Sequence, residues 1–173
     1  MKASNIPKLV EFARSDFKSV PKGPGVYVVF WMRDGKPIPI SRILGTDERG
    51  ILYIGATRGL KRRLKKLWNS IDAIRGKRKR KKFHTFVRSL VYTGLLNIIK
   101  DDELRVYFKE FSKEDAEYQE KLALLEYTRK YGEPPPLNLQ VGRQYFEIYG
   151  LSIYGESRYA DELDDDLRSV LGL

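Results

Sequence analysis

Two runs of β-branched and aromatic residues limit most strongly what this chain can fold into; they occupy residues 26–31 and 51–54. Short continuous runs of this kind are typical of buried β-strands. Gly-Ala-Thr-Arg-Gly follows the second run at residues 55–59 and is expected to end that strand. Leucines then recur at helical spacing, at Leu60, Leu64 and Leu67. The sequence therefore predicts two neighbouring strands with a helix directly behind them.

A third strand and a long helix are predicted in the second half of the chain. Residues 104–111 alternate as a strand does, and Ser112 with Asp115 three positions on indicates a helix N-cap. The helical pattern of apolar residues continues as far as Gly132. Three consecutive prolines, at positions 134–136, end the helix and lead into a loop.

The remaining elements complete an α/β chain of the α+β type. Residues 6–17 and 83–99 have helical patterns, so the predicted order is helix, strand, strand, helix, helix, strand, helix. This order predicts a small, mixed, three-stranded sheet flanked by helices. Residues 36–50 form an insert between the first two strands, which we interpret as an extra strand or arm.

The chain of 173 residues is long enough for one sizeable core. We expect residues 1–20 to form an N-terminal helix packed on the domain, residues 21–140 to form the domain itself, and residues 141–173 to form an acidic extension. The extension has seven acids against three arginines, and both an ordered cap and a mobile acidic tail fit this composition.

Composition limits which cellular compartment and which kind of metal site are expected. The chain has no cysteine, hence neither a disulfide framework nor a thiolate metal site, which fits a reducing compartment. No apolar stretch reaches the roughly 20 residues that span a bilayer. We therefore expect a cytoplasmic protein without a membrane partner.

Positive charge is concentrated in one part of the chain. The net charge is +10, and residues 56–88 contain fourteen Lys or Arg against a single acid, Asp72. The run at residues 77–82 has no apolar period and is interpreted as a flexible loop. Such a loop is the electrostatic footprint of a nucleic-acid groove, with a solvated surface or a nuclear-localisation-like signal as alternatives. The candidate nucleic-acid-binding residues are Arg58, Lys61, Arg62, Lys65, Lys66, Lys77, Arg78, Lys79, Arg80, Lys81 and Lys82.

Tyr27, Tyr53 and Arg63 are the first candidates for chemistry. The two tyrosines would lie on neighbouring strands, with Arg63 one or two turns into the helix behind them. A guanidinium binds phosphate oxygens as a fork, and two phenols can hydrogen-bond a water. Taken singly, each residue also has an ordinary explanation, as a half-buried packing tyrosine or as a solvated helix residue.

Glu126 and Asn138 are the second pair of candidates. Helical periodicity places Glu126 one turn after Leu122, at the edge of the apolar stripe rather than on a solvent face. A carboxylate there is unfavourable unless it is paired or coordinates a cation, and Mg²⁺ prefers hard oxygen ligands completed by waters and phosphates. A paired structural carboxylate is the alternative for Glu126, and a turn former is the alternative for Asn138.

The order and spacing of these residues resemble the GIY-YIG nuclease family. Gly25-Val26-Tyr27 is the first phrase and Tyr53-Ile54-Gly55 the second, and Arg63 follows Tyr53 by ten positions. Glu126 lies in an apolar run much farther on, and Asn138 follows it by twelve positions. The resemblance implies a metal-dependent endonuclease that hydrolyses phosphodiester bonds, with DNA as the expected substrate and partner.

The resemblance also implies a role for each residue. Tyr27 would act as general base on the attacking water, Tyr53 would help to arrange that water, and Arg63 would hold the scissile phosphate. Glu126 would be the sole protein ligand of one Mg²⁺ or Mn²⁺, while Asn138 would support the site. Such a site works by positioning and electrostatics, with one cation stabilising the leaving oxygen.

The chain departs from the family pattern at two points within residues 21–140. Many members have His or Tyr four residues after the arginine, where this chain has Leu67. His84 is the only histidine and the only candidate for the missing hydrogen-bond partner, although a packing or surface role is the alternative. Tyr27 and Tyr53 are also 26 positions apart, farther than in many members. A nucleic-acid-binding module that kept the fold and lost cutting is therefore the alternative function.

Overall fold

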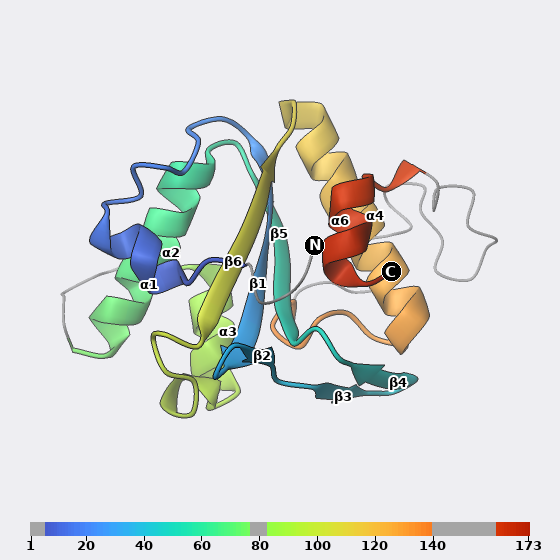
Figure 1. Cartoon of the computed structure of the whole chain (residues 1–173), viewed down its shortest axis with the longest axis horizontal. Coiled ribbons are helices and arrows are strands. Elements are labelled where there is room, and N and C mark those ends of the chain that lie inside the picture. Colours follow the sequence, from blue (N-terminus) through green and yellow to red (C-terminus); the bar gives the residue numbers. More distant parts are fainter. Residues whose placement is uncertain (1–5, 77–82, 140–161) are drawn as a thin grey trace.

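The computed structural model describes residues 6–76, 83–139 and 162–173. The sheet stands in the centre, with α1, α2 and α3 on one side and α4 and α6 on the other (Figure 1). The α+β class predicted from the sequence is confirmed.

The sheet is built around its first strand. β1 (Gly25–Arg33) pairs with β5 (Ile51–Thr57) on one side and with β6 (Leu104–Glu110) on the other. β2 (Lys36–Pro37) extends β1 as a short hairpin. A mixed sheet of three strands was expected, but β1, β2, β5 and β6 form a sheet of four strands, and all strand pairs in the described residues are antiparallel. β5 is thus left as an outer strand with one open edge.

Both faces of β1 are buried, which explains its continuous apolar run. Val26, Val28 and Phe30 belong to the core shared with α4 and α6. Tyr27 and Val29 point to the opposite face and belong to the core shared with α1, α2 and α3. Side chains alternate between the faces of a strand, so one strand supplies both cores.

β5 continues past the expected break at residues 55–59. Gly55 pairs with Tyr27 in the sheet, and a Cβ at position 55 would lie 2.8 Å from the Tyr27 hydroxyl oxygen. The glycine therefore makes room for tyrosine rings instead of ending the strand. The strand ends at Thr57, and α2 (Leu60–Ile74) begins after Gly59. Leu60, Leu64 and Leu67 are fully buried on one face of α2, as their spacing predicts.

The helix expected over residues 83–99 is shorter in the structure. α3 (Thr85–Tyr92) ends because Gly94 has a φ of 74°, which the helix cannot accommodate. A single 3-10 turn, η2 (Leu95–Asn97), follows.

The caps predicted for the long helix are confirmed. α4 (Lys113–Tyr131) begins after Ser112, whose hydroxyl oxygen accepts a hydrogen bond of 3.1 Å from the Asp115 N–H. It ends at Gly132, which has a φ of 80°. Ser112 and Gly132 thus fix both ends of the helix that lies opposite α2.

The two terminal helices pack on opposite sides of the sheet. α1 (Leu9–Arg14) lies near α2 and β6. α6 (Asp165–Leu171) packs on α4 and buries Leu167 and Leu171 in the same core. The described end of the acidic extension is therefore an ordered cap, while residues 141–161 lie outside the described part.

The insert forms a small hairpin, β3 (Ile40–Arg42) and β4 (Gly45–Asp47), held to the end of α4. Asp47 is fully buried and accepts a hydrogen bond of 2.9 Å from the Tyr127 hydroxyl. The Leu44 N–H donates to the Tyr131 carbonyl at 3.0 Å. The insert is therefore an arm packed on α4. Within the ranges given above, no helix has the length and apolar character needed to cross a membrane.

Candidate active site

Two tyrosines lie together on the α2 side of the sheet. The rings of Tyr27 and Tyr53 stack with centroids 5.9 Å apart. Burial raises the pKa of Tyr27 well above its usual value, and it also raises the pKa of Tyr53. The charge of Arg63 opposes both shifts. The structure thus brings together the three residues that the sequence singled out for phosphate chemistry.

His84 joins this group from the N-terminus of α3. Its Nδ1 accepts a hydrogen bond of 3.1 Å from the Phe86 N–H, so the neutral ring carries its hydrogen on Nε2. Nε2 lies 3.2 Å from the Tyr27 hydroxyl oxygen and 3.5 Å from an Arg63 guanidinium nitrogen. The Tyr27 oxygen therefore accepts a hydrogen bond from His84, the residue expected from the sequence as a partner in place of Leu67.

The position of His84 is fixed by α2 as well as by α3. Its backbone N–H donates to the Ser70 hydroxyl oxygen at 3.1 Å, and that hydroxyl donates to the Lys66 carbonyl at 2.7 Å. Ser70 and His84 are both buried. This chain of hydrogen bonds ties the start of α3 to the middle of α2 and holds the imidazole against Tyr27.

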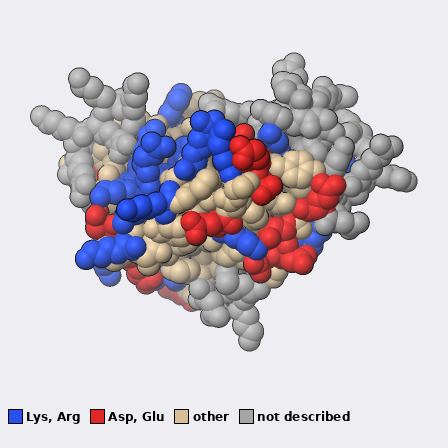
Figure 2. Space-filling view, turned by 90° about the horizontal axis from the view of Figure 1, so that it is seen from above, with Lys and Arg blue, Asp and Glu red and all other residues tan. Residues whose placement is uncertain are grey.

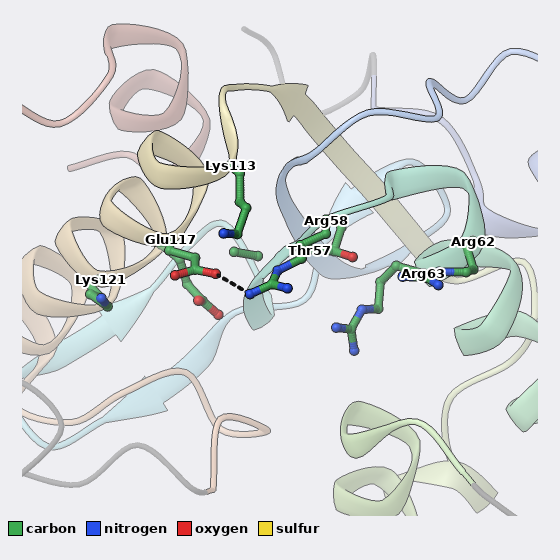
Figure 3. A pocket seen from close by; sticks show the side chains of 9 residues that line it. Thr57, Arg58, Arg62, Arg63, Lys113, Glu117 and Lys121 are labelled. Carbon is green, nitrogen blue, oxygen red and sulfur yellow. Dashed lines mark ion pairs between the residues drawn. The ribbon is translucent and has the colours of Figure 1, made fainter.

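A cavity of about 400 Å³ opens beside these residues, between α2 and α4. Figure 3 shows Arg63 reaching into it from α2, opposite Glu117 and Lys121 on α4. The floor is the end of β5. The lining residues are Ala56, Thr57, Arg58, Arg62, Arg63, Lys113, Glu117, Glu120 and Lys121. Five of the nine are cationic, so the cavity is suited to an anion such as phosphate.

Glu120 is the carboxylate that faces Arg63 and the tyrosines. Burial raises its pKa from 4.5 to about 7, against the opposing effects of the Ala56 backbone and of Arg63. The Glu120 charge in turn raises the pKa of both Tyr27 and Tyr53. Sequence reasoning missed this residue. A raised carboxyl pKa inside a basic cavity is a feature of functional sites.

The structure does not bring Glu126 to this cavity. Its carboxylate accepts a hydrogen bond of 2.9 Å from Arg129 on its own helix, and both side chains are largely buried. Six residues at about 100° each place Glu126 on a different side of α4 from Glu120. The paired structural carboxylate, the alternative interpretation of Glu126, matches this placement. Glu120, and not Glu126, lines the cavity.

Asn138 supports the floor of the site. Its side-chain oxygen accepts from the Ile54 N–H at 2.9 Å, and its side-chain nitrogen donates to the Ile54 carbonyl at 2.8 Å. Asn138 is buried and thus acts as a short extra strand on the open edge of β5. It holds the strand between Tyr53 and Gly55 without reaching into the cavity.

The predicted nucleic-acid-binding residues divide into three groups. Arg58 and Arg62 line the cavity. Lys61, Lys65 and Lys66 do not line the cavity, and Lys65 forms an ion pair of 2.7 Å with Asp16. Figure 2 shows Lys and Arg mainly on the α2 side and Asp and Glu mainly toward α4 and α6. The remaining six, Lys77, Arg78, Lys79, Arg80, Lys81 and Lys82, lie outside the described residues.

The donor set fits a cation that takes few protein ligands. In the described part of the chain, no group of three or more His, Cys, Asp or Glu could hold a metal ion. The cavity offers the carboxylates of Glu120 and Glu117. Mg²⁺ is often held by one or two carboxylates, with waters and substrate phosphates completing its shell. Such an ion fits here, whereas a cage made of protein ligands alone does not.

Comparison with known proteins gives no relative, because no family model, no curated protein and no solved structure matches the chain. The resemblance to GIY-YIG nucleases therefore stays a prediction. Function is inferred from the geometry of the site.

Proposed function

We propose that the chain is a metal-dependent endonuclease that hydrolyses phosphodiester bonds in DNA. The observation that carries the proposal is the convergence of five polar side chains, from five different elements, on one edge of the sheet. They are Tyr27 of β1, Tyr53 of β5, Arg63 of α2, His84 before α3 and Glu120 of α4. A cytoplasmic location and DNA as partner belong to the same proposal.

Arg63 would bind the scissile phosphate. It reaches into the cavity, and one of its guanidinium nitrogens lies 3.5 Å from Nε2 of His84. Arg58 and Arg62 line the same cavity and add positive charge beside it. A forked guanidinium fixes the orientation of a phosphate and stabilises the charge that develops on its oxygens.

Tyr27 would take the proton from the attacking water as the water oxygen bonds to phosphorus and the bond to the leaving oxygen breaks. The hydrogen on Nε2 of His84 is directed at the Tyr27 oxygen and favours the deprotonated phenol. Burial works in the opposite direction and raises the Tyr27 pKa. The charge of Arg63 lowers the Tyr27 pKa against this effect, and a hydrogen bond donated by His84 acts in the same direction. Tyr53, stacked on Tyr27, would hydrogen-bond the water.

Glu120 would hold the divalent ion, Mg²⁺ or Mn²⁺, with Glu117 within the same cavity. The ion would act as a Lewis acid on the leaving oxygen. Because the Glu120 charge raises the pKa of both tyrosines, neutralising that charge lowers both values toward the working range. Metal binding and base activation are therefore coupled through one carboxylate in this proposal.

The test is cleavage of supercoiled plasmid and of flap, fork and junction DNA by purified protein with Mg²⁺ or Mn²⁺. Glu120→Gln should abolish cleavage with the fold preserved, because the amide lacks the charge that holds the cation. Tyr27→Phe should slow the reaction on the order of 100-fold by removing the base. Tyr107→Phe is the matched control, since Tyr107 packs against the core on the far side of the sheet.

Wild-type cleavage by Glu120→Gln would remove Glu120 from the mechanism. If Glu126→Gln loses cleavage and Glu120→Gln keeps it, Glu126 is the metal ligand, as expected from the sequence. DNA binding without any cleavage by the wild-type protein would favour the alternative, a binding module on the same fold.

A further inference from the structure

A second groove lies along α3, separate from the cavity between α2 and α4. Its volume is about 470 Å³, and its lining residues are Thr85, Arg88, Ser89, Tyr92 and Leu139. The four residues of α3 have the spacing i, i+3, i+4 and i+7, so they form one face of the helix. Tyr92 is 85% exposed and Leu139 is 52% exposed. The groove thus offers an aromatic ring and a guanidinium from α3 and an apolar side chain, Leu139, from the segment after α4.

Both walls of the groove start next to residues of the candidate active site. Thr85 follows His84, which contacts Tyr27. Leu139 follows Asn138, which is bonded to Ile54 of β5. In Figure 3, α3 and the segment after α4 lie on the same side of the labelled cavity residues. A strand of nucleic acid whose phosphate lies at Arg63 is therefore expected to continue toward the groove.

The chemistry of the groove fits unpaired nucleotides. Nucleobases of single strands stack on exposed aromatic rings, and cationic side chains follow the phosphates. Tyr92 supplies such a ring and Arg88, one turn earlier, supplies the cation. Bases in a duplex are stacked on one another and offer no free face to a tyrosine. An apolar protein segment is a weaker fit, because Arg88 belongs to a stretch, residues 56–88, with fourteen cationic residues and one acid.

We infer that the groove along α3 binds single-stranded nucleotides next to the scissile phosphate, with a base stacked on Tyr92 and a phosphate bound by Arg88. The inference rests on the proposed function and names its substrate class: DNA with unpaired nucleotides beside the cleaved bond, such as a flap, fork or overhang. Fully paired DNA would use only the cavity between α2 and α4.

The test measures binding without cleavage, in protein carrying Glu120→Gln. The probes are a flap DNA with 2-aminopurine in its unpaired arm and a blunt duplex with the same label. We expect tighter binding of the flap and quenching of its fluorescence as the base stacks. Tyr92→Ala should weaken flap binding on the order of tenfold and abolish quenching, with duplex binding unchanged. Tyr92→Phe should keep both effects, because the ring remains.

A control substitution separates stacking from general surface change. Ile98→Ala alters an apolar side chain that is 55% exposed and does not line the groove, and it should leave flap binding unchanged. Circular dichroism of Tyr92→Ala should match that of the parent, since an exposed side chain contributes little to folding.

Equal flap affinity and equal quenching in Tyr92→Ala and its parent would overturn the inference, as would an equal loss for flap and duplex. The proposed nuclease function fails separately. If quenching depends on Tyr92 but the protein with Glu120 intact cuts no DNA, the groove along α3 is supported and the proposed nuclease function is rejected. The opposite result is cleavage that requires Glu120 but is equal for flap and duplex, both with Tyr92 and without it. That result would support the nuclease function and reject the proposed role of the groove.

Discussion

Glu120→Gln should make the protein more stable at alkaline pH, although it removes a residue proposed for catalysis. The Glu120 carboxyl has a pKa of about 7 in the fold against an ordinary value of 4.5. Between these values the folded state binds more protons than the unfolded chain, so the free energy of unfolding falls as pH rises. The difference corresponds to at most about 3 kcal/mol, and about 1–2 kcal/mol once partial solvent exposure is considered. Glutamine is neutral at every pH and avoids this loss.

The assay is urea unfolding followed by circular dichroism at pH 4 and pH 8, in the presence of a chelator. At pH 8 the unfolding free energy of Glu120→Gln should exceed that of the wild type by about 1–2 kcal/mol. At pH 4 the two proteins should be nearly equal, because the wild-type carboxyl is then protonated in the fold and largely so in the unfolded chain. The gain should therefore develop between pH 4.5 and 7.

Glu126→Gln is the matched control on the same helix, and its effect should have the opposite sign. Glu126 forms an ion pair of 2.9 Å with Arg129, with 14% and 16% of the two side chains exposed. Losing one partner of a mostly buried pair is destabilising, by about 1–3 kcal/mol for this partly exposed case. A Glu120→Gln protein no more stable than the wild type at pH 8 would refute the reasoning, because Glu120 would then ionise in the fold without loss.

Three further predictions concern other residues of the candidate active site and its surroundings. His84→Phe keeps an aromatic ring but removes the hydrogen bond to Tyr27, so the tyrosine should titrate at higher pH by NMR, whereas an unchanged titration would exclude the contact. Asn138→Ala loses two hydrogen bonds to buried backbone and should lower the free energy of unfolding by about 2 kcal/mol, which thermal unfolding would detect; no loss would mean that water replaces the amide. Arg62→Ala should reduce the slope of log affinity for duplex DNA against log salt by about 0.9. Lys65 lies outside the cavity lining, so Lys65→Ala should leave the slope unchanged. Equal slopes in the two variants would show that Arg62 does not contact DNA.

Local patterns in the sequence were sufficient to predict most of the fold. The strands around Tyr27 and Tyr53 are continuous apolar runs, and Ser112 and Gly132 mark the ends of α4 by their own chemistry. The early end of α3 was missed, because the apolar pattern continues past Gly94 and outweighed the glycine as a signal for the end of a helix. The antiparallel pairing was missed as well, since strand direction depends on contacts between distant segments.

The candidate site was predictable where its residues lie on β1, β5 and α2 and not where they lie on α4. That helix is enclosed by the sheet, by α6 and by the insert, so Leu122, Leu124, Leu125 and Tyr127 are all buried. With apolar residues on several sides of the helix, periodicity cannot identify the side that faces the cavity. His84 was a candidate hydrogen-bond partner because it is the single histidine of the chain, but the sequence did not identify which residue it contacts. Its contact with Tyr27 spans 57 positions and depends on how α3 packs against α2.

The open edge of β5 has a consequence for how the protein behaves in concentrated solution. Unpaired strand edges invite a strand from another copy and lead to aggregation. Here the Leu52 carbonyl accepts from the Leu137 N–H at 3.0 Å, Ile54 is bonded to Asn138, and the backbone of Ala56 is bonded to Glu120. Residues that serve the proposed chemistry therefore also shield the sheet from self-association. Variants at Asn138 that lose activity would be expected to form oligomers as well, through the strand edge they uncover.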